Sequence, residues 1–269
     1  KIKRGCHRTA AGQRIDGPIT GGNGIHFDSG VGVQNLTASA EGAELTVGLA
    51  MTNITFGTNS ASSDSLALGY NHACGLLDNG SVKCWGVSSN GRLGNFATQN
   101  TGDNAGEMGD ALAVSNLGTG RTATAISSGL PETSPHTCAV LDDGTVKCWG
   151  GNAFGQLGIG NTTTMGGTAQ KMGDNLSAVD LGTGRTAVDV SVGDRYSCAL
   201  LDNGDVKCWG RNTHGQLGIG NTMNMGDDAD EMGDNLSAVD LGTGRTAVGI
   251  ATGYAHACAI LDNGLVKCW

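Results

Sequence analysis

Eight of the nine cysteines stand in four pairs, and these pairs have the clearest capacity for chemistry in this 269-residue chain. The two members of each pair are ten positions apart, and a tryptophan follows the second member directly. Cysteines at this spacing form a disulfide, bind a metal ion or stay as buried thiols. No Cys-x2-Cys motif or histidine pair accompanies them, so a zinc site is the least favoured of the three, and we expect no metal centre. The pairs are Cys74 with Cys84, Cys138 with Cys148, Cys198 with Cys208, and Cys258 with Cys268.

The residues between paired cysteines predict a β-hairpin. In the third copy two short apolar runs flank Asp202-Asn203-Gly204, a combination that suits a three-residue hairpin loop. Centring the hairpin on Asn203 places Cys198 opposite Cys208 at a non-hydrogen-bonded pair, where facing side chains come closest. This geometry suits a cross-strand disulfide. Such a small ring contributes roughly 2.5–3 kcal/mol through loop-closure entropy.

The hairpin belongs to a longer repeat, because the first cysteines of the four pairs are 64, 60 and 60 residues apart. A Gly-Gln-Leu-Gly motif begins at Gly155 and again at Gly215, and a Met-Gly-Asp-Asn-Leu-Ser-Ala-Val-Asp-Leu-Gly-Thr-Gly-Arg run begins at Met172 and Met232. We predict four strands per unit: an Ala-Val-Asp-Val-Ser strand, the two hairpin strands and the Leu-Ser-Ala-Val-Asp run. Short strands with glycine-rich corners and no helical period indicate an all-β array.

The repeat resembles that of the regulator of chromosome condensation family. The resemblance rests on His-x-Cys-Ala-Leu-Leu-Asp-Asn-Gly-x-Val-Lys-Cys-Trp-Gly followed by Gly-Gln-Leu-Gly, and it covers residues 64–269. The cysteine-paired form is similar to the family's extracellular relatives. The resemblance implies a β-propeller, in its full form a seven-bladed ring with one four-stranded blade per repeat. The family's nucleotide exchange on a small GTPase is not expected here, because this acidic, cysteine-paired chain departs from the nuclear protein.

The number of repeats predicts an open or incomplete ring. Three complete units are present, and the fourth stops at Trp269 after its hairpin. Propellers need about four or more blades to close, and an open array leaves strand edges that invite pairing. Three explanations compete: the chain is a fragment of a longer one, a neighbouring copy supplies the missing strands head to tail, or residues 1–63 complete the edge.

Residues 1–63 form a separate segment of different sequence. Rough alternation broken by glycines predicts β-strands, although the stretch from residue 37 to 49 also suits a short helix. We expect this segment to assist assembly or to complete a blade. Its single cysteine, Cys6, has no partner in the repeat scheme, and three alternatives stay open: a bond to a neighbouring chain, a bond to a missing segment, or a free thiol.

Composition and sequons favour an extracellular protein. Glycine accounts for 47 residues, charged residues for only 15% and aromatic residues for 4%, which suits a corner-rich β chain stapled by disulfides. The net charge of −9 argues against nucleic acid as a partner, and no apolar stretch is long enough to span a membrane. Six asparagines lie in Asn-x-Ser/Thr sequons for N-glycosylation: Asn35, Asn53, Asn79, Asn161, Asn175 and Asn235.

The remaining polar residues predict no catalytic site and no cofactor. A histidine stands two positions before the first cysteine at His72, His136 and His256, but Tyr196 replaces it in the third unit, so packing is favoured over metal binding. The acidic loop 227–234 could hold one calcium ion, yet its equivalent at residues 166–171 has lost nearly all carboxylates. The tryptophans Trp85, Trp149, Trp209 and Trp269 are expected to pack between blades rather than stack on sugars.

The sequence therefore predicts a secreted, glycosylated, disulfide-stapled structural repeat protein that is not an enzyme. We expect its partner to be another copy of itself, joined head to tail in a filament or surface layer. The alternative is a ligand-binding or adhesion propeller, part of a longer chain, that recognises a glycan or a surface protein through its loop face.

Overall fold

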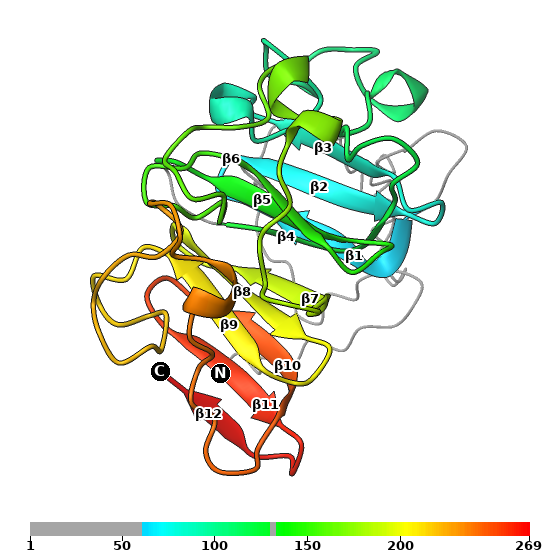
Figure 1. Ribbon diagram of the computed structural model, residues 1–269. Helices are drawn as coiled ribbons and strands as arrows, with labels where there is room; N and C mark the ends of the chain where they lie inside the picture. The colour runs from blue at the N-terminus through cyan, green and yellow to red at the C-terminus, as the bar shows by residue number, and fades with distance from the viewer. Residues whose placement is uncertain (1–60, 130–132) are drawn as a thin grey trace, which may run out of the picture. The chain divides into compact units, whose positions relative to one another are not determined.

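The computed structural model describes residues 61–129 and 133–269. The predicted boundary between residues 63 and 64 stays a prediction. Within the described residues the chain forms only β-strands and short 3-10 turns (Figure 1). The strands are β1 Ala61–Leu68, β2 His72–Leu77, β3 Val82–Gly86, β4 Ala123–Ser128, β5 His136–Leu141, β6 Val146–Gly150, β7 Ala187–Val192, β8 Tyr196–Leu201, β9 Val206–Gly210, β10 Ala247–Thr252, β11 Ala257–Leu261 and β12 Val266–Cys268.

Five single-turn 3-10 helices interrupt the loops of the described residues: η1 Ser89–Gly91, η2 Gly109–Ala111, η3 Ala169–Lys171, η4 Gly173–Asn175 and η5 Gly233–Asn235. No helix in the described ranges has the length and apolar character needed to cross a bilayer.

The strands form four antiparallel sheets, β1-β2-β3, β4-β5-β6, β7-β8-β9 and β10-β11-β12, one for each cysteine pair. The hairpin register is the predicted one, with Leu200 opposite Val206 and Cys198 opposite Cys208. The loop closes through the Gly204 amide, which donates to the Leu201 carbonyl at 2.9 Å. The two cysteine Cα atoms are 4.0 Å apart, as expected at a non-hydrogen-bonded pair.

Each sheet has three strands, so the prediction of a fourth strand in the Leu-Ser-Ala-Val-Asp run is wrong. In the second unit the run makes one backbone bond to the third strand, from the Val179 amide to the Val146 carbonyl at 2.8 Å. Its buried residues are Leu176, Val179 and Leu181, a spacing that breaks the alternation of a strand. The run therefore crosses the sheet edge as extended coil and sends three side chains into the core.

The four sheets follow one another as stacked blades. The first strand of each sheet packs on the first two strands of the sheet before it: β4 on β1 and β2, β7 on β4 and β5, and β10 on β7 and β8. The apolar core consequently lies between blades. One cluster joins Cys138 of the second unit to Val190 and Trp209 of the third, and similar clusters lie on either side of it along the stack.

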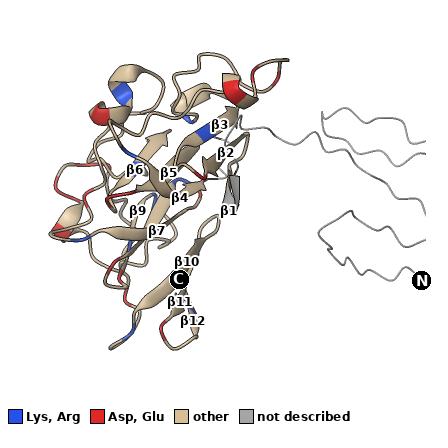
Figure 2. Cartoon of the chain, turned by 90° about the vertical axis from the view of Figure 1, so that its right-hand side faces the viewer, with Lys and Arg blue, Asp and Glu red and all other residues tan. Residues whose placement is uncertain are grey.

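Polar bonds reinforce this stacking. The Val192 amide donates to Ser127 Oγ of the preceding blade at 3.0 Å, and the Thr252 amide donates to Ser191 Oγ at 3.1 Å. Along the described chain, the segments coloured for Asp and Glu lie mainly in the loops that leave the strands (Figure 2). The strands of neighbouring blades are thus joined by apolar contacts and by hydrogen bonds from backbone amides to serine hydroxyls.

Candidate functional site

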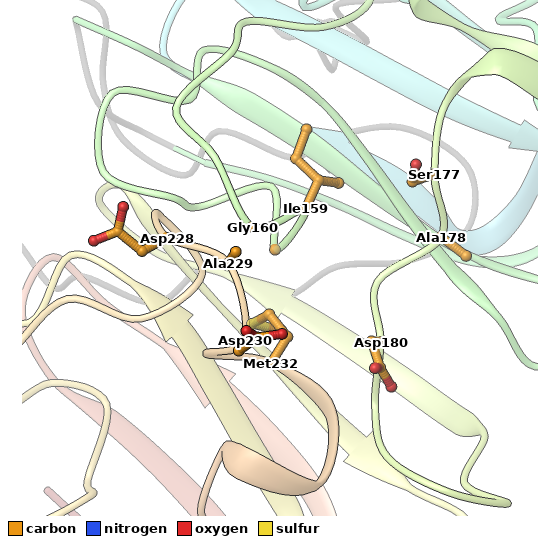
Figure 3. Close-up of a pocket in the computed structure, with 10 residues that line it drawn as sticks. Ile159, Gly160, Ser177, Ala178, Asp180, Asp228, Ala229, Asp230 and Met232 are labelled. Carbon is orange, nitrogen blue, oxygen red and sulfur yellow. The ribbon is translucent and has the colours of Figure 1, made fainter.

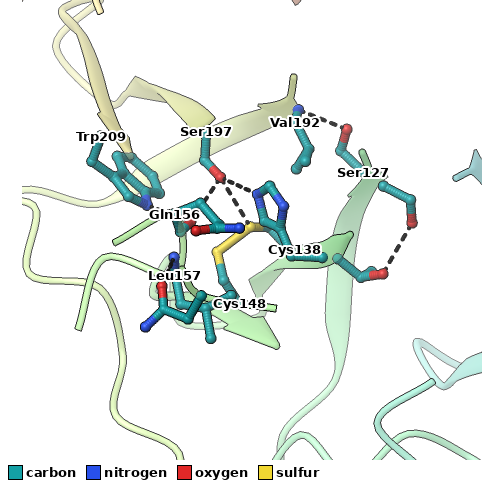
Figure 4. Close-up of a disulfide and its surroundings, with 12 residues drawn as sticks. Ser127, Cys138, Cys148, Gln156, Leu157, Val192, Ser197 and Trp209 are labelled. Carbon is teal, nitrogen blue, oxygen red and sulfur yellow. Dashed lines mark hydrogen bonds between the residues drawn. A yellow bond between two sulfur atoms is a disulfide. The ribbon is translucent and has the colours of Figure 1, made fainter. Parts of the chain in front are cut away.

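A polar cluster lies beside the Cys138–Cys148 disulfide, at the junction of the second and third blades (Figure 4). His136 Nε2 lies 2.8 Å from Ser197 Oγ. Ser197 Oγ also donates to the Gln156 carbonyl at 3.0 Å, and the same carbonyl accepts from Trp209 Nε1 at 3.0 Å. His136, Ser197 and Trp209 are fully buried, so this cluster is closed to solvent.

The His136–Ser197 pair has the separation of a base and a nucleophile, but its hydrogen bonds run the opposite way. A serine hydroxyl has one proton, and that proton is donated to the Gln156 carbonyl. His136 Nε2 must therefore donate to Ser197, which leaves Nδ1 as an acceptor with no partner. Burial lowers the pKa of His136 to about 3, with a smaller contribution from nearby His72. The pair is a neutral structural bond between blades.

The same arrangement recurs one repeat earlier. His72 Nε2 lies 2.9 Å from Thr137 Oγ1, and Trp149 Nε1 donates to the Arg92 carbonyl at 3.0 Å. Burial, and to a lesser degree the Arg92 charge, lower the pKa of His72 to about 4. The predicted packing roles of the histidine and the tryptophan are therefore confirmed at the first two of the three junctions between blades.

The pattern changes at the third junction. Tyr196 stands in place of the histidine, and its hydroxyl donates to the His256 and Gly253 carbonyls of the fourth blade. Trp269 still donates from Nε1 to the Gln216 carbonyl at 3.0 Å. His256 itself is exposed, unlike His72 and His136.

The structure contains the four expected disulfides: Cys74–Cys84, Cys138–Cys148, Cys198–Cys208 and Cys258–Cys268. The first three are buried between blades, whereas Cys268 of the fourth is exposed. All four join the two strands of a hairpin, and the three buried ones pack against the core. Cys6 lies outside the described residues.

Four of the six sequon asparagines fall in the described part of the chain, and all four are exposed. The Asn161 side chain accepts from the Thr163 amide at 2.8 Å within its own sequon, and the Asn79 side chain accepts from Ser81 in the same way at 2.9 Å. Asn175 and Asn235 occupy equivalent 3-10 turns, η4 and η5, in successive repeats. Asn35 and Asn53 lie outside the described residues, and glycosylation of all six stays a prediction.

The acidic loop of the third unit borders an open cleft of about 270 Å³ (Figure 3). Asp228 and Asp230 of the loop line this cleft together with Asp180 of the preceding repeat, and Ile159 and Met232 add apolar lining. Another carboxylate of the loop, Glu231, accepts from three backbone amides of residues 226–228 and is thereby engaged. No group of three or more histidines, cysteines or carboxylates suited to a metal ion occurs among the described residues.

Sequence reasoning missed a second set of contacts between repeats. Lys147 Nζ donates to the Leu117 carbonyl at 3.1 Å and to the Gly173 carbonyl at 2.7 Å. Asp174 accepts from the Thr119 hydroxyl at 2.6 Å and from its amide at 2.9 Å, and these bonds lower the pKa of Asp174. Equivalent contacts recur one repeat on. These contacts could have been predicted from the sequence, because the lysine and the aspartate recur at fixed positions in successive repeats.

Comparison with known proteins gives the same repeat. The family described as regulator of chromosome condensation (RCC1) repeat matches residues 64–92, 136–156 and 187–216. The human E3 ubiquitin-protein ligase HERC2 is 27% identical over 204 residues, which cover 76% of this chain and 4% of HERC2. The ultraviolet-B receptor UVR8 of Arabidopsis thaliana is 30% identical over 158 residues, which cover 59% of this chain and 31% of the receptor.

Solved structures agree on the fold. Yeast RCC1 (Prp20), in its crystal structure with Kap60, aligns with a TM-score of 0.54 and 21% identity over 78% of this chain and 44% of its own. Human WBSCR16 aligns with a TM-score of 0.56 and 20% identity over 79% of this chain and 48% of its own. This chain thus spans less than half of each of these proteins. Three stretches of this chain thus match the RCC1 repeat, and each of its four hairpins carries a disulfide.

Proposed function

We propose that this chain is a secreted, N-glycosylated structural repeat protein whose copies join head to tail through the faces of their outermost blades. The observation that carries the proposal is a change in exposure. Where two blades meet inside the chain, the residues at the junction are buried. The equivalent residues on the outer faces of the first and last blades are exposed, and most of them are apolar.

The last blade has one such face. Val266 of the last blade is equivalent to Val206 of the third. Val266 pairs with Ile260 across its hairpin, as Val206 pairs with Leu200. Val206 is fully buried, whereas Val266 is 63% exposed and Ile260 beside it is 50% exposed. His256 is exposed on the same blade, although His136 in the equivalent position donates to a serine of the next blade.

The first blade has the complementary face. Leu66 and Leu68 on β1 occupy the positions of Val190 and Val192 on β7. The two valines are 4% and 6% exposed because they lie against the preceding blade, whereas the two leucines are 55% and 65% exposed.

The two faces suit one another because the interior of the chain already contains three junctions of this kind. Each junction joins the first strand of one blade to the first two strands of the preceding blade, which is the pairing that a second copy would continue. Such a contact is heterologous, so it propagates into a filament unless its rotation closes a ring.

Secretion is supported by the four disulfides, since such bonds persist in oxidising compartments. N-glycosylation is supported by the exposure of Asn79, Asn161, Asn175 and Asn235. After expression through a eukaryotic secretory pathway, removal of N-glycans should lower the mass of the protein. An identical mass before and after treatment would refute this part of the proposal.

The head-to-tail contact is tested by blocking each face separately. One variant carries Ile260→Lys and Val266→Lys, and the other carries Leu66→Lys and Leu68→Lys. All four side chains are half-exposed or more, so the blades should fold normally. A matched control replaces Val188 and Val248 with lysine. These two valines are as exposed as the residues changed in the blocked variants, but they occupy equivalent positions on β7 and β10 and are not among the residues assigned to either end face.

Sedimentation velocity should show polymers for the unreduced parent chain and for the control, and monomers for each blocked variant alone. An equimolar mixture of the two variants should form dimers only, because one intact face of each kind remains. A monomeric parent chain, or polymers of either blocked variant, would refute the head-to-tail contact.

A further inference from the structure

Phe96 adopts a backbone conformation that its residue type disfavours. Its φ angle is +64°, in the left-handed region, where a bulky side chain is an outlier. The equivalent residues of the second and third units are Gly160 and Gly220, with φ angles of +68° and +78°. The loop therefore requires a positive φ in all three repeats, and only the first repeat meets it with an aromatic residue. Strain of this kind concentrates at functional sites.

Core packing does not account for this exchange. The Phe96 ring is partly buried against the first interblade cluster, whereas Ile159 and Ile219, one position earlier in their repeats, pack against the next two clusters. The isoleucine position is Asn95 in the first unit. An isoleucine followed by glycine thus satisfies the core elsewhere in this chain. The pair Asn95-Phe96 brings an amide and an aromatic ring to the same place.

Both residues line an open cleft of about 430 Å³ in the first unit, a volume within the range of small-molecule sites. The cleft is uncharged apart from Glu107, and the Glu107 carboxylate accepts from the amides of Gly102 and Asn104 at 2.7 and 3.1 Å. Hydroxyl and amide side chains make up most of the remaining lining: Asn95, Thr98, Gln99, Asn100 and Thr101.

The Asn95 and Asn100 amides in this lining are held in place and keep free donors. Asn95 Oδ1 accepts from the Ala97 amide at 3.2 Å, and Asn100 Oδ1 accepts from the Ser88 amide at 3.3 Å. Within the described part of the chain, Nδ2 of both asparagines and the side chain of Gln99 have no hydrogen-bond partner. Donors fixed in this way lose little conformational entropy when they bind a ligand.

We propose that this cleft binds a neutral carbohydrate, with Phe96 as the stacking surface for the apolar face of a sugar ring. Amide groups, which donate and accept, suit the adjacent hydroxyls of a sugar. A charged ligand would find no free counter-charge here, and a purely apolar ligand would leave the amides unpaired. The site lies in the loops of the first unit and does not depend on the head-to-tail contact.

The proposal is tested by saturation-transfer NMR on the full unreduced chain with maltose, cellobiose, lactose and N,N′-diacetylchitobiose, each at about 10 mM, a concentration that detects millimolar affinity. At least one disaccharide should receive saturation from the protein. The double variant Asn95→Ile with Phe96→Gly, which recreates the sequence of the other two repeats, should lose this signal at least tenfold. Its thermal midpoint should be equal to or higher than that of the parent, since glycine relieves the strain.

Two further variants sharpen the result. Gln99→Ala removes an exposed donor without altering the core, and it should weaken binding several-fold even if the double variant folds poorly. Asp228→Asn, in the cleft of Figure 3, should leave binding unchanged. The proposal is overturned if none of the four sugars receives saturation, if the double variant binds as the parent does, or if a neutral tripeptide binds in place of the sugars.

Discussion

At the scale of single residues, most polar groups that could do chemistry are used to join blades. His72 and His136 are each hydrogen-bonded to a hydroxyl of the next blade. Beside each hydroxyl, a backbone carbonyl accepts a hydrogen bond from a tryptophan. Because these groups are buried and neutral, they contribute to stability rather than to catalysis. Burying them also costs free energy, because the Nδ1 atom of each histidine is buried without a hydrogen-bond partner.

This burial predicts a dependence of stability on pH. The folded-state pKa values of about 4 for His72 and about 3 for His136 lie below the unfolded value of about 6.5. The unfolded chain therefore binds more protons below pH 6.5, and the free energy of unfolding falls as the pH drops towards 4. Each histidine contributes a slope of up to about 1.4 kcal/mol per pH unit. Urea unfolding between pH 7.5 and 4.5 measures this slope.

The matched control is His256→Gln, because His256 is exposed and faces no further blade. This variant should keep the slope, whereas His136→Gln should reduce it. A pH-independent free energy of unfolding between 7.5 and 4.5 would contradict the account of the buried histidines.

At the scale of elements, the hairpin could be predicted almost completely from the sequence. The turn residues Asp202, Asn203 and Gly204 fix the loop length, and the loop length fixes which cysteines face each other. The fourth strand could not be predicted correctly, since Leu176, Val179 and Leu181 are buried at a spacing set by the neighbouring blade. Local alternation carries no information about that contact.

The hairpin turn also contacts the next blade. A glycine-to-alanine substitution in the turn should therefore affect the free energy of unfolding differently at Gly204 and at Gly264. Gly204 and Gly264 have nearly equal φ angles of +82° and +81°. A Cβ atom added at Gly204 would lie 2.5 Å from Thr246 Cβ of the next repeat, whereas a Cβ at Gly264 would meet nothing within 4 Å.

Gly264→Ala should therefore lower the free energy of unfolding by the conformational cost alone, roughly 1–2 kcal/mol. Gly204→Ala should lower it by more, because the clash with Thr246 adds overpacking of about 1–3 kcal/mol. Denaturant unfolding of both variants under non-reducing conditions measures the difference. If both variants lost the same free energy of unfolding, the contact between the Gly204 turn and Thr246 of the next blade would not contribute to stability.

At the scale of the whole molecule, the repeat period and the cysteine spacing predicted the stacked blades and the four disulfides. The sequence did not indicate which faces of the blades would be exposed, because Val206 and Val266 are the same residue at the same place in the repeat, each followed by Lys-Cys-Trp. Their exposures differ only because a further blade covers one and not the other. The cleft at Phe96 was missed for a related reason. Its signal, Asn95-Phe96 in place of Ile-Gly, has meaning only once the positive φ is known.

Negative-stain electron microscopy of the native, unreduced chain tests the central claim most directly. Head-to-tail contact between the first and last blades predicts filaments or layers with a regular repeat along their axis. The variant with Ile260→Lys and Val266→Lys should show only single particles under the same conditions. Isolated particles of single-chain size in the parent preparation would contradict the claim that the end faces of the blade array join copies of this chain.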